Sequence, residues 1–186
     1  MPKIEVELQV RDEDGDLVEE QREAVNLATD QWVTLMEALH TRAATNGLTS
    51  INLAIDDGST NDFYVAVNSE TSFFSCDDND VGPRIAIGDG GGSSVTPTRS
   101  NYQLDNQLAR KDAGTPSKGS DSVTISATFT NNTGSSYTVR ETGMFQKMFS
   151  GGANRADDVL MYHDAVSATS VADGNSVTVT YSFTWP

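Results

Sequence analysis

The stretch SVTVTYSFTW, residues 176–185, alternates large apolar side chains with serine and threonine. Successive side chains of a strand point to opposite faces of its sheet, so this period of two predicts a strand with one buried face. The apolar face holds Val177, Val179, Tyr181, Phe183 and Trp185. We expect Val177, Val179 and Tyr181 in the core, whereas Trp185 can either complete the core or form a subunit contact.

The same alternation predicts further strands on both sides of this one. Residues 4–10 form one, and the turn 12–16 joins it in a hairpin to a second strand that begins near Leu17. Shorter strands are expected at 51–55 and 63–67, on either side of the turn 56–58. The last third adds strands at 123–130, around Tyr137 and Val139, and at 159–162, with a turn at 131–134.

One segment, residues 30–45, follows a helical period instead. Its apolar side chains recur every three or four residues: Trp32, Leu35, Met36, Leu39 and Ala43. Asp30 is expected to cap the start of this helix, and Gly47 stands where a helix stop is expected. Short strands separated by Gly, Asn and Asp turns, with one early amphipathic helix, predict a mainly β chain. We expect a single domain over 1–186, an antiparallel β-sandwich or jelly-roll-like fold.

The segment 88–122 is predicted to be rich in loops. It contains the glycine run 90–92 and many serine, threonine and asparagine residues. Three apolar residues in it, Tyr102, Leu104 and Leu108, are expected to anchor the segment. Because long loops commonly carry interfaces, these three residues and Trp185 are the interface candidates.

The charge of the chain is strongly negative. Asp and Glu number 27 against 12 Lys and Arg, which gives a formal net charge of −15. Such a surface repels phosphate backbones, so we expect no nucleic-acid partner. Only four of the basic residues are lysines, a bias that favours adaptation to concentrated salt, where ions screen the self-repulsion. An ordinary acidic protein is the alternative, and unfolding or aggregation at low salt separates the two.

Residues for catalysis are scarce, and we expect no enzyme. The two histidines, His40 and His163, lie in a predicted helix and a predicted strand, where core or surface packing is the expected role. Cys76 is the single cysteine, so no intrachain disulfide can form. The run 88–92 lacks the Gly-Lys-Ser/Thr ending of a phosphate loop. No apolar stretch is long enough to span a membrane, so no membrane partner is expected.

Two acidic clusters are weak calcium candidates, and no other cofactor is expected. The carboxylates concerned are Asp12, Asp14, Asp16, Asp77, Asp78 and Asp80. Neither cluster supplies the bidentate Glu at the twelfth position of a calcium loop, so solvated turns are the expected reading. Asn131-Asn132-Thr133 matches the glycosylation sequon in a turn that we expect to be exposed.

Two spaced segments carry a family resemblance. RIAIGDG, residues 84–90, is followed by Pro97-Thr98, and VRETGMF, residues 139–145, is followed by VADGNSVTVTY, residues 171–181. This order resembles small virion structural proteins of tailed viruses, of the head decoration, turret or tail-fibre type, here from a halophilic archaeal host. The chain departs from the family in the acidic stretch 56–81 and the polar stretch 113–122.

The resemblance implies a non-enzymatic capsid decoration or turret component. Such a protein would assemble in the host cytoplasm as a trimer or pentamer and stand on the particle exterior with other virion proteins. Two alternatives stay open. One is a tail-fibre or baseplate component, and the other is a carbohydrate- or receptor-binding module with Tyr64, Phe73, Phe74 and Tyr102 as stacking residues.

Overall fold

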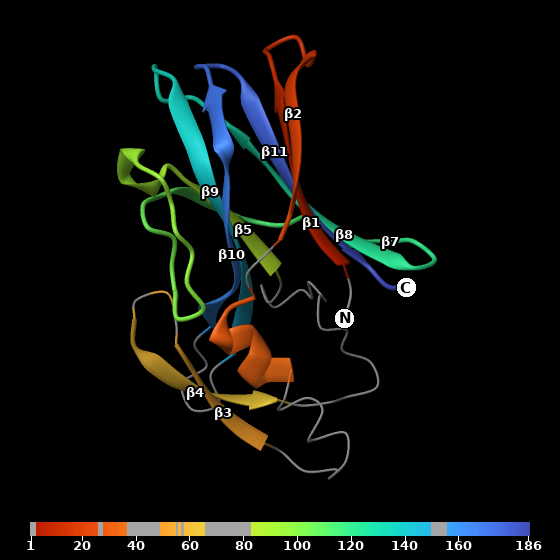
Figure 1. Ribbon diagram of the computed structural model, residues 1–186, viewed down its shortest axis with the longest axis vertical. Coiled ribbons are helices and arrows are strands. Elements are labelled where there is room, and N and C mark those ends of the chain that lie inside the picture. Colours follow the sequence, from red (N-terminus) through yellow and green to blue (C-terminus); the bar gives the residue numbers. More distant parts are fainter. Residues whose placement is uncertain are drawn as a thin grey trace.

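The computed structural model describes residues 3–25, 28–36, 49–54, 56, 58–65, 83–149 and 156–186. Within these ranges the chain is mainly β, with two antiparallel sheets, a separate two-stranded hairpin and one helix (Figure 1). The two sheets lie against each other in an arrangement consistent with a β-sandwich, which confirms the predicted fold class. The jelly-roll alternative stays a prediction.

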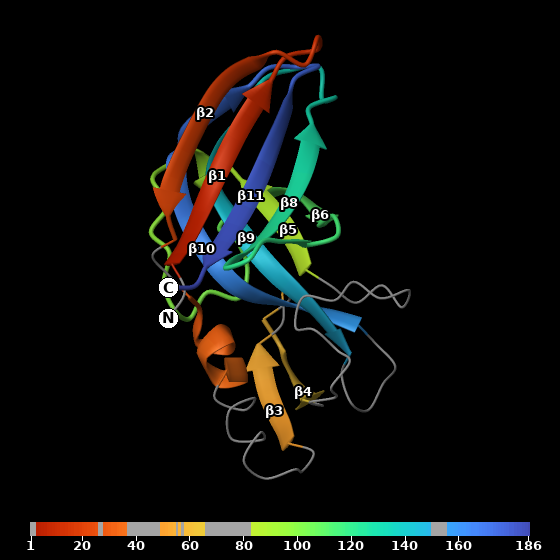
Figure 2. The same ribbon diagram turned by 90° about the vertical axis from the view of Figure 1, so that its right-hand side faces the viewer.

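The five-stranded sheet has the order β2-β1-β11-β8-β7 and contains the strands with the clearest alternation (Figure 2). Its members are β1 (Lys3–Arg11), β2 (Leu17–Ala24), β7 (Ser117–Lys118), β8 (Ser122–Thr130) and β11 (Ser176–Thr184). Strand β11 pairs with β1 and with β8 over its whole length. Val177, Val179, Tyr181 and Phe183 are buried, as predicted, because every second side chain of β11 faces the second sheet.

The four-stranded sheet has the order β10-β9-β5-β6. Its members are β5 (Pro83–Gly88), β6 (Gln107–Asp112), β9 (Tyr137–Phe149) and β10 (Ala156–Val171). The segment 88–122, predicted to be rich in loops, also contains two strands that the sequence did not indicate, β6 and β7. Strand β6, with the sequence QLARKD, lies at the end of the sheet with mostly exposed side chains, so it lacks the alternating apolar residues that mark a half-buried strand.

Side-chain and backbone bonds join the two sheets along both sides. Gln21 Nε2 on β2 donates to the Ser167 carbonyl oxygen on β10 at 3.0 Å, and Glu23 Oε1 accepts from Ser167 N and Oγ, each at 2.8 Å. On the other side, Lys111 Nζ on β6 donates to the Thr128 carbonyl oxygen at 3.1 Å. The bonds therefore hold β2 to β10 along one side of the sandwich and β6 to β8 along the other.

The helix begins at residue 30 and is described as far as residue 36. Thr29, not Asp30, is the residue before the first turn, and the Asp30 carboxylate instead lies 3.3 Å from Arg99 Nε. Leu35 is buried in the main core and Trp32 packs against it. The rest of the predicted helix, with Leu39 and Ala43, and Gly47 lie outside the described residues.

The remaining element is a hairpin of β3 (Thr49–Ala54) and β4 (Thr60–Val65), close to the two strands predicted there. Leu53 belongs to the main core. None of the helical residues that the structure describes forms a span long and apolar enough to cross a membrane.

Candidate functional site

The loop between β5 and β6, residues 89–106, lies across the face of the four-stranded sheet that is turned away from the main core (Figure 1). A second, smaller apolar core beneath it joins Leu104 of the loop to Ala86, Phe145 and Leu160 of the sheet. The loop begins with a single 3₁₀ turn, η1 (Gly90–Gly92), whose first N–H, that of Gly90, points toward Glu141 on β9.

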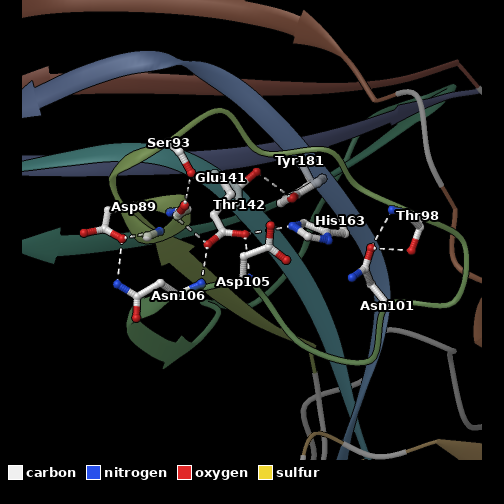
Figure 3. Close-up of polar contacts among 12 residues, drawn as sticks. Asp89, Ser93, Thr98, Asn101, Asp105, Asn106, Glu141, Thr142, His163 and Tyr181 are labelled. Carbon is white, nitrogen blue, oxygen red and sulfur yellow. Dashed lines mark hydrogen bonds and ion pairs between the residues drawn. The ribbon is translucent and has the colours of Figure 1, made fainter.

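Glu141 on β9 holds both ends of this loop. Its Oε1 accepts from the backbone N–H of Gly90 at 3.2 Å and of Asn106 at 2.9 Å. Its Oε2 accepts from the backbone N–H of Asp105 at 3.0 Å and from His163 Nε2 at 2.8 Å (Figure 3). One fully buried carboxylate therefore receives four hydrogen bonds, three of them from the loop.

These hydrogen bonds keep the Glu141 carboxylate ionised although it is fully buried. Burial by itself raises the pKa of Glu141, but the hydrogen bonds from His163, Asn106 and Asp105 outweigh it and hold the pKa below the ordinary value of 4.5. An ionised Glu141 accepts only, so the hydrogen of the shared bond lies on His163 Nε2. The charge is thus compensated by oriented N–H groups rather than by an arginine or lysine.

His163 on β10 forms the floor of the cluster. Its side chain is fully buried, and its Nδ1 has no hydrogen-bond partner among the described residues. His163 lies opposite Gly143 in the β9–β10 register, next to the position of Glu141. On the opposite face of β9, Thr142 Oγ1 and Tyr181 Oη are 2.9 Å apart inside the main core.

Two glycines make the close approach of the loop possible. A side chain at Gly88 would collide with the Glu141 carboxylate and the Asn106 carbonyl oxygen, and one at Gly143 would collide with Leu104. The family-like segments 84–90 and 139–145 therefore contain the carboxylate that binds the loop and the glycines that leave room for it.

The loop is also bonded internally and to the helix. Asp89 Oδ1 accepts from Gly91 N at 2.8 Å and from Asn106 Nδ2 at 2.7 Å. The Arg99 carbonyl oxygen accepts from Asp30 N at 2.8 Å, which ties the middle of the loop to the first turn of the helix. A long segment with one short turn of regular structure is in this way held in one conformation.

A second polar cluster lies on β5, β6 and β10. Asp158 Oδ2 is 2.9 Å from Arg84 Nη1 and 3.1 Å from Arg110 Nη1. Arg110 Nη2 also lies 2.6 Å from Asp56 Oδ2, and its guanidinium stacks over Phe145 at 4.6 Å from the ring centroid. This cluster connects the strands to the segment after β3, and every charge in it faces one of opposite sign.

The four interface candidates divide into two groups. Tyr102, Leu108 and Trp185 are 36%, 39% and 43% exposed and lie on the surface of the chain. Leu104 is 2% exposed and lies in the small core, so it anchors the loop, as predicted, and is not exposed for contact with a neighbour. Of the residues proposed to stack on a sugar, Phe73 and Phe74 and the side chain of Tyr64 lie outside the described part.

In the acidic turn 12–16, a first calcium candidate, the Asp12 carboxylate binds backbone N–H groups of the turn itself. Asp12 Oδ1 accepts from the N–H of Asp14 at 3.1 Å and of Asp16 at 2.9 Å, as in an Asx turn. No group of three or more His, Cys, Asp or Glu suited to a metal ion occurs in the described ranges. The second calcium candidate, with Asp77, Asp78 and Asp80, lies outside them, as do His40 and Cys76.

The expectation that Asn131 is exposed is wrong. Asn131 is buried, and its Nδ2 donates to the carbonyl oxygens of Val171 at 2.9 Å and Ser135 at 2.8 Å. Its Oδ1 accepts from the N–H of Thr133 at 3.1 Å. In the folded chain the nitrogen that glycosylation would modify therefore donates two hydrogen bonds that hold the turn. A turn residue can be buried in this way when its side-chain amide bonds backbone groups that have no backbone partner.

The pair of Glu141 and His163 is the feature that the sequence patterns missed. Glu141 shares the outward face of its strand with Gly143 and Phe145, which is a weak signal of a buried carboxylate. No spacing rule connects it to His163 or to the loop amides. Comparison of the chain with family models, curated proteins and solved structures finds no match. The function is therefore argued from the geometry.

Proposed function

We propose that the chain is a non-enzymatic structural protein of a virus particle, of the capsid decoration or turret type, that assembles as a homo-oligomer on the outside of the head. The observation that carries this proposal is the use of the fully buried carboxylate of Glu141 to hold the loop 89–106 in one conformation. A loop fixed to a β scaffold offers a surface of constant shape, which assembly with many identical neighbours requires.

The buried polar groups of this cluster serve structure. Both carboxylate oxygens of Glu141 are occupied by donors from its own chain, and His163 is fully buried beneath them. A general base must reach a substrate proton, and this carboxylate is enclosed by Gly90, Asp105 and Asn106. This arrangement fits a loop whose surface contacts a neighbouring protein better than it fits catalysis by Glu141 or His163.

The surface properties fit an assembly in concentrated salt. With a net charge of −15, two copies repel each other at low ionic strength, and molar salt shortens the screening length to about 3 Å. Exposed apolar side chains such as Leu108 and Trp185 can then be buried between copies.

The test is the mass of the purified chain by light scattering in molar potassium chloride, measured over a wide range of protein concentration. A closed trimer or pentamer is expected, and it should dissociate when the salt is lowered. A monomer at every concentration in molar salt would overturn the homo-oligomer and with it this function.

A further inference from the structure

A hollow of about 210 Å³ opens beside the loop 89–106. Its walls come from the loop, from β9 and from β10: Ser94, Val95, Arg140, Ala165, Val166 and Ala168. Four of these residues are apolar, one carries a hydroxyl and one carries a guanidinium. The hollow is separate from the Glu141 carboxylate, although Arg140 precedes Glu141 in the chain.

An irregularity of the sheet forms this hollow. In the β9–β10 register Glu141 lies opposite Ala165 and Val139 lies opposite Thr169, so residues 166–168 of β10 all stand opposite Arg140 alone. Extra residues in one strand make it bend locally and redirect its side chains. The bend is held in place from the other sheet, since Gln21 and Glu23 bind both the carbonyl oxygen and the N–H of Ser167.

The side chain of Arg140 makes no hydrogen bond or ion pair within the part of the chain that the structure describes. Among the other described arginines, Arg11 donates to the Gly15 carbonyl oxygen, and the remaining four lie against carboxylates: Arg22, Arg84, Arg99 and Arg110. A guanidinium over a hollow with apolar walls recognises a carboxylate attached to an apolar group.

The chain itself carries a segment of that chemistry at the end of the β1–β2 hairpin. Leu17 and Val18 are 48% and 59% exposed and are the only two adjacent large apolar residues exposed in the described ranges. They directly follow Asp14 and Asp16, whose carboxylates have no partner among the described residues. The hairpin projects at one end of the molecule, where a neighbour can reach it (Figures 1 and 2).

We propose that the hollow around Arg140 receives the hairpin end of a second copy of this chain, with Asp16 against the Arg140 guanidinium and Leu17 or Val18 against Val95 and Ala168. The proposal rests on the homo-oligomer proposed above and identifies one of its contacts. The two surfaces are different, so the contact is head-to-tail, the kind that closes into a ring such as a trimer or pentamer. Arg140 is already half-buried beside the hollow, so concentrated salt screens an ion pair there less than one between fully exposed groups.

A charge swap tests the contact, with the mass in molar potassium chloride as the measurement. R140E and D16R should each weaken the oligomer at least about tenfold in dissociation constant, as expected for loss of a desolvated ion pair. The double variant R140E/D16R should restore the oligomer, since each copy then carries the reversed pair. K118E is the matched control: Lys118 is exposed on β7, has no partner among the described residues and undergoes the same charge change.

The outcomes separate this contact from the function as a whole. Weakening by both single variants, with recovery in the double variant and none of this in K118E, supports the proposal. A wild-type oligomer that R140E leaves intact overturns the contact but not the homo-oligomer. Failure of the double variant to recover overturns the hairpin as occupant, provided that circular dichroism shows each variant folded. A wild-type monomer overturns both proposals.

Discussion

Strand β9 has two faces, and they are covered in different ways. On the inner face, Met144 packs in the main core and Thr142 bonds Tyr181 of the opposite sheet. On the outer face, Phe145 contributes to a small core, and Glu141 binds three N–H groups of the loop 89–106. Apolar contact tolerates small shifts, whereas a carboxylate with four donors allows one arrangement. The inner face stabilises the fold, and the outer face determines the shape of a surface loop.

The largest effect is expected from a change on the inner side of the sandwich. Phe183→Ala removes a buried ring that packs against Tyr162 at 5.8 Å between centroids. The cavity and the lost transfer free energy should lower the free energy of unfolding by about 3–5 kcal/mol. Denaturant titration measures this, with Thr180→Ala on the other face of β11 as the control. A loss below about 1 kcal/mol would mean that the two sheets do not share this core.

The outer face should respond to a smaller chemical change. Glu141→Gln keeps the shape of the side chain but presents N–H groups to some of the donors that the carboxylate accepts from. We expect a loss of about 2–4 kcal/mol, because buried donors are left without an acceptor. Hydrogen exchange of the Gly90, Asp105 and Asn106 amides should become faster, while β11 amides change less.

Glu20→Gln is the control for this variant, since it makes the same change at an exposed carboxylate that pairs with Arg22. It should alter the free energy of unfolding by no more than about 0.5 kcal/mol. Equal effects of the two variants would contradict the role given to Glu141.

The pH dependence of the free energy of unfolding should also distinguish the outer face of β9, which carries Glu141, from the inner face. The pKa of Glu141 is lower in the folded chain than its ordinary value of 4.5, so the unfolded chain binds this proton more readily. The stabilisation from Glu141 is therefore complete above the unfolded pKa and is lost as the pH falls through the folded pKa. Titrating the free energy of unfolding of the wild type and of Glu141→Gln should show a smaller loss in acid for the variant. Parallel curves would show that other carboxylates dominate.

The smallest effect is expected at a buried turn. Asn131→Ala removes the donor to the Val171 carbonyl oxygen and should cost about 1–2 kcal/mol. Asn132→Ala, at the exposed neighbouring position, should cost less than about 0.5 kcal/mol. Thermal unfolding compares the two, and equal shifts would mean that the turn does not depend on the buried amide.

The contrast between the faces also explains what could be predicted from the sequence. Period two in 176–185 and 123–130 identifies strands and their buried faces, because burial against a second sheet depends only on which side a residue points to. The burial of Leu104 is predictable for another reason, because it is a large apolar residue within a mostly polar loop. Strand β6 lacks this period because most of its side chains are exposed.

The bond between Glu141 and His163 needs a different kind of information. The two residues are 22 positions apart and meet only because β9 and β10 pair in the register that puts Gly143 opposite His163 and Glu141 opposite Ala165. Neither residue type nor spacing encodes that register. The burial of Asn131 was missed for a related reason, since its acceptor, Val171, comes from the distant end of β10.

The most direct test of the structural role is the position of the chain in purified virus particles. The proposal predicts that a cryo-electron microscopy map of the particle contains this two-sheet domain in repeated copies on the outer surface of the head, with the loop 89–106 in the conformation held by Glu141. Particles that lack the chain, while it is present in lysates of infected cells, would contradict the proposal.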